Sequence, residues 1–168
     1  YDSSTFDLKR MEEMMSYVGN PHKKRRAVHI TGTKGKGTTT SILHSLLATD
    51  AARVFSGGNI GRPPIAFLDK LRSDDRVVLE LSSFQLQDLD LSPDIALVLS
   101  ITEDHLDYHT DRTEYITAKR PICSHQKATD ILIVNQDCPT ARSFAAHSPA
   151  AIWHYSAAAP VAQGAWVD

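Results

Sequence analysis

The chain has 168 residues, of which 42% are hydrophobic and 23% charged, a balance typical of one globular domain with a buried core. Lys and Arg together number 18 and Asp and Glu 20, so the net charge of −2 excludes the basic excess of a nucleic-acid-binding domain. Two cysteines without CxxC spacing favour neither a zinc site nor a disulfide framework, and no apolar run reaches membrane-spanning length. We therefore expect a cytoplasmic protein.

Residues 1–26 are predicted to form an N-terminal helix followed by a linker. Apolar residues recur there at helical spacing, at Leu8, Met11, Met14, Met15 and Val18. Gly19-Asn20-Pro21 then ends the helix.

A strand, a glycine-rich loop and a second helix follow. The run 27–31 is rich in apolar and β-branched residues and predicts a short strand, and the helix extends from Lys36 to Ala48. We expect the inner face of this helix to carry its apolar side chains, Ile42, Leu43, Leu46 and Leu47.

Strand-like runs then alternate with helical patterns to the end of the chain. The predicted strands are 53–56, 77–81, 95–101, 131–134 and 152–155, and residues 164–168 resemble the start of another. Asp111 and Glu114, in capping-box spacing, open a helix that we expect to extend to Cys123. This alternation predicts an α/β fold of the P-loop, Rossmann-like type, with a mostly parallel sheet and helices on both faces.

The segment after the first strand has the composition of a phosphate-binding loop. Its glycines leave backbone N–H groups free to contact phosphate oxygens, and the N-terminus of the following helix favours an anion. Lys36 supplies a positive charge for the outer phosphates, and the Thr38 hydroxyl could bind Mg²⁺. The strict P-loop pattern fails at Ile30 and at Gly37, so a glycine-rich turn that only caps a helix is the alternative. The predicted nucleotide-binding residues are Gly32, Thr33, Lys34, Gly35, Lys36, Gly37, Thr38 and Thr39.

Several motifs connect this loop to a known family. Gly32-Thr33-Lys34-Gly35-Lys36-Gly37-Thr38 resembles the phosphate loop of the Mur ligases and of the related folylpolyglutamate synthases. Further along, GGNIG at 57–61, ELSSFQL at 80–86 and TEDHLD at 102–107 resemble the Mur ligase branch that joins D-glutamate to UDP-N-acetylmuramoyl-L-alanine. The resemblance covers roughly residues 27–146. It implies the central, ATP-binding domain of a Mur ligase.

The resemblance implies ATP and Mg²⁺ as cofactors and a set of residues that bind the metal. Glu80 lies inside an apolar run, where a carboxylate is costly unless it pairs or binds a metal, although bonds to backbone amides are the alternative. His105 follows a strand-like run and matches a Mg²⁺ ligand of the family, but could instead cap a helix or lie in the core. Tyr115-x-x-Ala118-Lys119 resembles a Mur ligase segment whose lysine reacts with CO₂ to form a metal-binding carbamate. The implied metal site is Thr38, Glu80, His105 and Lys119.

The resemblance also implies catalytic and substrate-binding roles. Lys36, His105 and Lys119 would be the catalytic residues. Asn59, Ser82 and Gln85 would contact the UDP-sugar substrate, although Asn59 after two glycines could simply be a turn residue.

The implied activity is an ATP-dependent acid–D-amino-acid ligase of peptidoglycan biosynthesis that forms an acyl phosphate. Enzymes of this kind carry a further domain on each side of the central one, so we expect residues 1–168 to be a fragment that is inactive when isolated. A folylpolyglutamate synthase is one alternative, favoured by the N-terminal helix and Gly37. A non-catalytic nucleotide-binding module is another, but Lys36, Glu80, His105 and Lys119 together argue against it.

Overall fold

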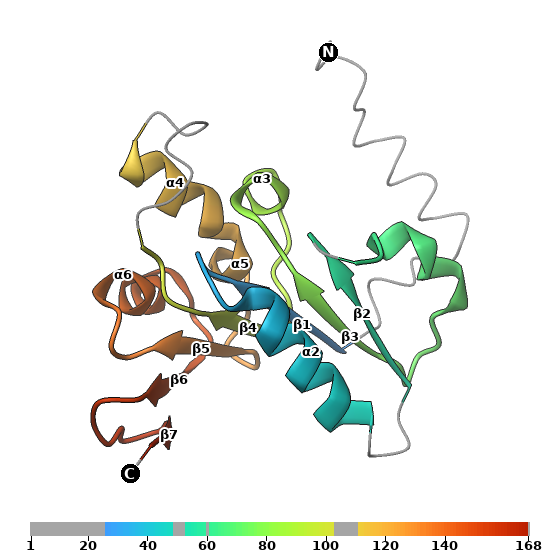
Figure 1. The fold of residues 1–168 in the computed structure, drawn as a ribbon. Coiled ribbons are helices and arrows are strands. Elements are labelled where there is room, and N and C mark those ends of the chain that lie inside the picture. The colour runs from blue at the N-terminus through green and yellow to red at the C-terminus, as the bar shows by residue number, and fades with distance from the viewer. Residues whose placement is uncertain (1–25, 49–52, 60, 103–110, 168) are drawn as a thin grey trace.

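The computed structural model describes residues 26–48, 53–59, 61–102 and 111–167, and its centre is a parallel sheet (Figure 1). The predicted helix within residues 1–26 and the candidate ligand His105 lie outside the described residues. Seven strands pair in the order β2-β3-β1-β4-β5-β6-β7, and every pair is parallel. The strands are β1 (Arg26–Thr31), β2 (Val54–Gly58), β3 (Arg76–Glu80), β4 (Ile95–Val98), β5 (Ile131–Asn135), β6 (Ala151–Ser156) and β7 (Gly164–Trp166).

Helices cover both faces of the sheet, as predicted for the α/β fold. Helix α2 (Lys36–Leu47) packs on β1, β2 and β3, while the other face carries α3 (Ser83–Leu86), α4 (Arg112–Lys119), α5 (Pro121–Ser124) and α6 (Pro139–Arg142). Successive side chains of a strand point to opposite faces of the sheet. In β4, Ala96 and Val98 pack in the larger hydrophobic cluster, on the face of α3 to α6, and Leu97 packs in the smaller cluster, on the face of α2. Three short 3₁₀ helices, η4 (Pro64–Ala66), η5 (Leu68–Lys70) and η6 (Ser143–His147), complete the described elements.

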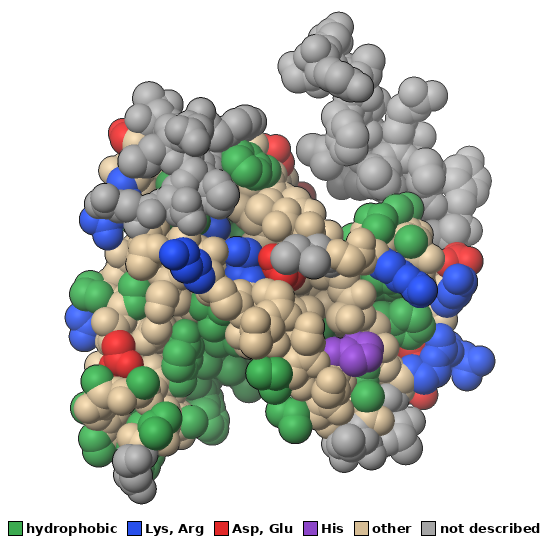
Figure 2. Space-filling view, in the orientation of Figure 1, with side chains coloured by type: hydrophobic (Ala, Val, Ile, Leu, Met, Phe, Trp, Pro, Cys, Tyr) green, Lys and Arg blue, Asp and Glu red, His purple; other side chains and the backbone are tan. Residues whose placement is uncertain are grey.

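Helix α2 buries a narrower stripe than the sequence predicted. Leu43 and Leu47 pack against the sheet, but Ile42 is 56% exposed and Leu46 65% exposed. Each residue of a helix turns about 100° from the last, so 42 and 46 lie to one side of the stripe formed by 43 and 47. Figure 2 also shows hydrophobic side chains over the sheet between α2 and β6. Trp153 of β6 is 41% exposed.

Two predicted elements are shorter in the structure. The helix expected from Asp111 to Cys123 divides into α4 and α5 at Pro121, which has no N–H to continue the helical hydrogen bonds. The strand expected from Ile95 to Ile101 ends at Val98. Beyond Val98 the chain bonds to the end of β1 and the loop after it, since Leu99 N–H donates to the Thr31 carbonyl.

His29 in β1 makes the fold sensitive to acid. Its Nδ1 atom is buried and has no hydrogen-bond partner within the described residues. Burial lowers the pKa of His29 from 6.5 to about 4. Between pH 6.5 and pH 4, His29 therefore binds a proton in the unfolded chain but not in the folded chain. The free energy of unfolding falls as the pH drops through this range.

We predict that His29→Leu flattens this part of the stability profile. The unfolding free energy of the original chain should fall between pH 7 and pH 4.5 by up to about 3 kcal/mol more than that of the variant. Urea unfolding at both pH values measures the difference. Parallel losses in the two proteins would show that His29 does not titrate as proposed.

Candidate functional site

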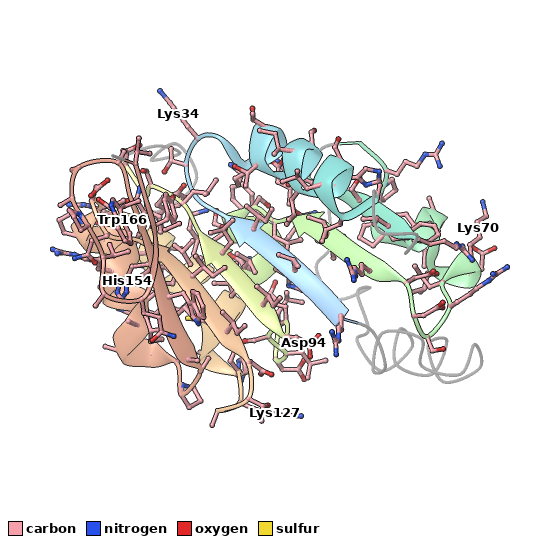
Figure 3. All side chains as sticks on the ribbon, turned by 90° about the horizontal axis from the view of Figure 1, so that it is seen from below. Lys34, Lys70, Asp94, Lys127, His154 and Trp166 are labelled. Atoms are coloured by element: carbon pink, nitrogen blue, oxygen red, sulfur yellow. The ribbon has the colours of Figure 1, made fainter. Side chains whose placement is uncertain are left out.

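The site lies at the carboxyl edge of the sheet, where the strand order reverses around β1. Strand β1 has β3 on one side and β4 on the other, and the loop that follows it enters α2 directly. Ligands of parallel α/β sheets bind at such a switch point. Figure 3 shows Lys34 projecting outward from this loop, away from the sheet.

Gly32 and Thr33 hold the phosphate loop against the end of β4. Gly32 has φ 151°, and a Cβ atom there would lie 2.7 Å from Leu99 Cβ. Thr33 N–H donates to the Ser100 carbonyl over 2.8 Å. The Thr33 hydroxyl donates to the Thr102 carbonyl over 3.2 Å and accepts from Thr102 N–H over 2.9 Å. The loop is therefore fixed by its own backbone and one side chain.

Lys36 folds back over the loop. Its ammonium donates to the carbonyls of Gly32, over 3.1 Å, and Thr33, over 3.0 Å. Gly35 precedes it with φ 83° at the N-cap of α2, where no side chain caps the helix. The first backbone N–H groups of α2 and the ammonium thus surround one position suited to an anion.

The two predicted loop hydroxyls differ in their bonds. The Thr39 hydroxyl donates to the Gly35 carbonyl over 2.8 Å and so serves the helix backbone. The exposed Thr38 hydroxyl makes no hydrogen bond within the described part of the chain. Thr38 is therefore the one of the pair with an oxygen available to a ligand.

Glu80 ends β3 as a buried carboxylate. It is 2% exposed, and no hydrogen-bond or ion-pair partner for its carboxylate lies among the described residues. The strand register places it beside Ile30 of β1 and Gly58 of β2. A charged group in such a place needs a counter-charge, and a cation is the chemistry that fits.

Lys119 reaches the same edge of the sheet from α4. It is 2% exposed, and its ammonium lies 3.4 Å from the Thr31 hydroxyl and 4.5 Å from the centre of the Tyr115 ring. Burial, and then the positive charge of Lys36, lower the pKa of Lys119 from 10.5 to about 7. Part of the Lys119 population is therefore a neutral amine near pH 7, which the sequence alone did not indicate.

The three predicted substrate contacts lie at the ends of β2 and β3. Asn59 is exposed, and its N–H donates to the Glu80 carbonyl over 2.8 Å. Ser82 and Gln85 form a capping box at the start of α3, in which Ser82 N–H donates to Gln85 Oε1 over 3.0 Å and Gln85 N–H donates to Ser82 Oγ over 3.3 Å. Both side chains are thus engaged with each other at this edge.

Neither a cluster of metal ligands nor a membrane-spanning helix is present among the described residues. Across residues 26–48, 53–59, 61–102 and 111–167, no group of three His, Cys, Asp or Glu side chains is placed to share a metal ion. His105 lies outside these ranges, and Lys119 is not of those residue types. In the same ranges no helix combines the length and apolarity needed to cross a membrane.

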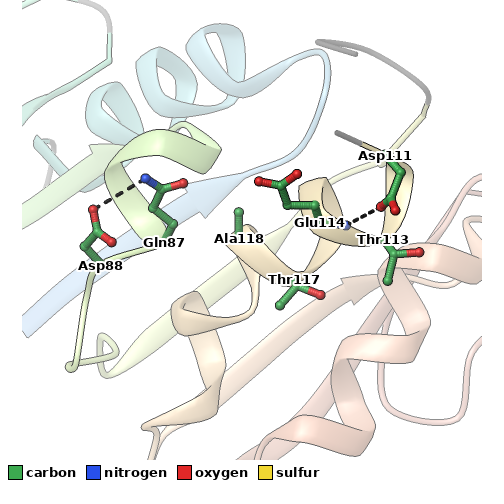
Figure 4. Close-up of a pocket in the computed structure, with 7 residues that line it drawn as sticks. All are labelled: Gln87, Asp88, Asp111, Thr113, Glu114, Thr117 and Ala118. Carbon is green, nitrogen blue, oxygen red and sulfur yellow. Dashed lines mark hydrogen bonds between the residues drawn. The ribbon is translucent and has the colours of Figure 1, made fainter. Parts of the chain in front are cut away.

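An open pocket of about 440 Å³ lies between α3 and α4 (Figure 4). Asp88, Asp111 and Glu114 line it, together with Gln87, Thr113, Thr117 and Ala118. Three carboxylates repel phosphate, so the pocket is unsuited to a nucleotide. The anion site remains at the phosphate loop.

Three residues that sequence reasoning did not select connect the site. The Thr31 hydroxyl donates to the Leu81 carbonyl over 3.1 Å and accepts from Lys119. Tyr115 Oη lies 3.4 Å from Thr33 Oγ1, and Thr102 binds that same hydroxyl. Tyr115 was visible only as part of the Y-x-x-A-K segment, and the spacing of the chain gives no sign of the contact.

Known proteins match this chain in sequence. The Mur ligase middle domain family matches residues 30–166. The UDP-N-acetylmuramoylalanine–D-glutamate ligase of Clostridium perfringens is 42% identical over 127 residues, which are 76% of this chain and 27% of that enzyme. The ligase of the same name from Clostridium botulinum strain Alaska E43 is 38% identical over 156 residues, 93% of this chain and 33% of that enzyme. The chain spans about a third of the length of these curated relatives.

Solved structures share the fold. MurF ligase from Thermotoga maritima in complex with ADP has a TM-score of 0.69 at 22% identity, over 86% of this chain and 36% of that one. Mycobacterium tuberculosis folylpolyglutamate synthase complexed with ADP and AMPPCP has a TM-score of 0.65 at 14% identity, over 91% of this chain and 49% of that one. These structural similarities establish the fold and confirm the predicted α/β class.

We predict that Gly32→Ala destabilises the chain more than Gly61→Ala. Both glycines have positive φ, at 151° and 84°, but an added Cβ at Gly61 meets no atom within 4 Å. The difference between the variants therefore reports the crowding of an added Cβ at Gly32 by Leu99 and Ser100, together with the greater backbone strain at φ 151°, and we expect about 1–3 kcal/mol. Urea unfolding midpoints measure it. Equal losses would mean that the loop does not pack closely on β4.

Proposed function

The chain belongs to the Mur ligase middle domain family, and from this premise we propose that its phosphate loop binds ATP for the ligation of D-glutamate to UDP-N-acetylmuramoyl-L-alanine. The observation that carries the proposal is the meeting of Lys36, Glu80 and Lys119 at one edge of the sheet. The half-buried ammonium of Lys36 suits the phosphates, and the buried carboxylate of Glu80 suits a cation bound with them, with the buried amine of Lys119 at the same edge.

The loop would bind the phosphates through its backbone. The N–H groups at the start of α2 have no side-chain cap and would donate to phosphate oxygens. The Lys36 ammonium, which now donates to the Gly32 carbonyl, would donate to a phosphate oxygen instead. Because Gly32 and Thr33 are already held in place, little of the binding free energy is lost in ordering the loop.

The residues present fit Mg²⁺. Glu80 is a buried carboxylate without a partner in the described residues, and Thr38 has a free hydroxyl oxygen. We propose that these two residues, His105 and a carbamate of Lys119 would hold Mg²⁺. Bound there, Mg²⁺ would offset the negative charge of the polyphosphate during transfer.

The proposed reaction has two steps. The alanyl carboxylate attacks the γ-phosphorus of ATP, the bond to ADP breaks, and an acyl phosphate forms. The amine of D-glutamate then attacks the acyl carbon, loses a proton and expels phosphate to leave the amide. Lys36 would stabilise the charge on the transferred phosphoryl group, while Asn59, Ser82 and Gln85 would orient the UDP-sugar.

This activity belongs to the longer protein. The curated relatives are about three times the length of the matched region, so we propose that residues 1–168 form the central domain of a three-domain cytoplasmic enzyme. The remaining domains would bind the UDP group and close over ATP. The isolated chain would bind nucleotide without turnover.

We predict that Lys36→Ala weakens the binding of Mg²⁺–ATP to this chain at least about tenfold, since it removes charged hydrogen bonds to phosphate. Glu80→Gln should weaken binding by about the same factor in Mg²⁺ and little in EDTA. Isothermal titration with ATP measures both, and Lys70→Ala, at the exposed η5, is the control. Unchanged affinity for Lys36→Ala would refute the phosphate-loop assignment.

We predict that Lys119 forms a carbamate. The neutral amine attacks CO₂, an N–C bond forms, and the lost proton passes to solvent, so burial and the lowered pKa of about 7 favour the reaction. Carbon-13 NMR in labelled bicarbonate at pH 8 with Mg²⁺ should show a carbamate carbonyl that disappears in Lys119→Arg. The exposed Lys127→Arg should keep it.

The same lysine gives a test in the full-length protein. Lys119→Ala should abolish ligation, and a short carboxylic acid should restore part of it by replacing the carbamate. Near-normal ligation by Lys119→Ala would show that the carbamate is not needed.

A further inference from the structure

One buried tyrosine connects the phosphate loop to the lysine of α4. Tyr115 is 2% exposed, and its two ends meet different parts of the proposed site. Its Oη lies 3.4 Å from Thr33 Oγ1 in the loop, 82 residues away in sequence. Its ring lies under the Lys119 ammonium, 4.5 Å from ring centre to Nζ.

The hydrogen count at Thr33 sets the direction of this bond. A threonine hydroxyl has one proton and two lone pairs. Thr33 donates its proton to the Thr102 carbonyl and accepts from Thr102 N–H. With the Thr33 proton on the Thr102 carbonyl, the remaining lone pair of Thr33 accepts, and this arrangement makes Tyr115 the donor in the pair.

The aromatic ring of Tyr115 makes the second contact, with the Lys119 side chain. An ammonium over an aromatic face is attracted by the ring quadrupole, more strongly when both are desolvated. Lys119 stands one helical turn after Tyr115, so the ring limits the positions that the ammonium can take. Its remaining described hydrogen bond, to the Thr31 hydroxyl, is long at 3.4 Å.

These contacts join the elements that carry the site. Thr33 belongs to the phosphate loop, Thr102 directly precedes the segment with Glu103 and His105, and Lys119 belongs to α4. Tyr115 contacts the first and the last of these, and it reaches the second through the hydroxyl of Thr33.

We propose that Tyr115 is a positioning residue that couples the phosphate loop to Lys119, with its hydroxyl orienting Thr33 and its ring limiting the positions that the Lys119 side chain can take. This role rests on the proposed function for its consequence in ligation, but the coupling itself is a property of the free chain. A residue that merely fills the core would need neither the hydroxyl nor its direction.

The first test is a double-mutant cycle on nucleotide affinity. Tyr115→Phe removes the hydroxyl and keeps the ring, and it should weaken ADP binding about twofold to fivefold, because the 3.4 Å bond is long. In a Thr33→Val background the same change should have no further effect. Tyr155→Phe is the matched control, because it removes the hydroxyl of the other tyrosine in the described residues. Additive losses in the cycle would overturn the coupling.

The second test needs no nucleotide. Amide hydrogen exchange at Thr33 and Thr102 should become faster in Tyr115→Phe and stay unchanged in Tyr155→Phe, at matched melting temperatures. In Tyr115→Leu the ring-current shift of the Lys119 Cε protons should disappear, whereas Tyr115→Phe should keep it. Unchanged exchange in Tyr115→Phe would overturn the proposal. If the original chain fails to bind ADP, the nucleotide assignment falls, and exchange still decides the role of Tyr115.

Discussion

The close packing of the phosphate loop on the end of β4 is the constraint on which the site depends. Gly32 must lack a side chain because Leu99 Cβ would lie 2.7 Å from its Cβ, and this contact brings Thr33 to Ser100 and Thr102. The backbone of the loop is thereby fixed before any ligand binds, so an anion can bind without the loop having to become ordered. Beyond β4, Leu99 N–H donates to the Thr31 carbonyl at the end of β1, so the hydrogen bonds between these two strands continue into the site.

The electrostatics of the site follow from that placement. Lys36 lies over the loop and Lys119 is buried at the same edge of the sheet, where burial, and then the positive charge of Lys36, lower the pKa of Lys119. Glu80 on the adjacent strand is buried without a partner in the described residues, so its negative charge is not neutralised there, and the charged form of Lys119 is disfavoured beside Lys36. A polyphosphate with a divalent cation resolves both conditions, and carbamate formation would turn one of the two positive charges into a negative one.

The sequence predicted the parts of this site that depend on local spacing. The glycines, Lys36 and the alternation of strands and helices are local signals, and the fold they indicated is present. The burial of Lys119 could not be derived in that way, because it depends on how α4 docks on the sheet. Ile42 and Leu46 were misplaced since apolar character does not say which side of α2 meets the strands. Tyr115 and Thr33 are 82 residues apart, and no periodicity reports such a contact.

The segment that we propose binds the UDP-sugar is connected through its backbone to Glu80, which we propose binds the metal. In the proposed function the phosphate loop binds the nucleotide, while Asn59, Ser82 and Gln85, in the segments after β2 and β3, would contact the UDP-sugar. There Asn59 N–H donates to the Glu80 carbonyl, and a Cβ on Gly58 would lie 2.0 Å from that same oxygen. The residue that we assign to the metal therefore also fixes the loop that we assign to the UDP-sugar. A shift of β2 that moved Asn59 would therefore also move the backbone of Glu80, so the proposed sugar-binding and metal-binding residues are linked through one strand end.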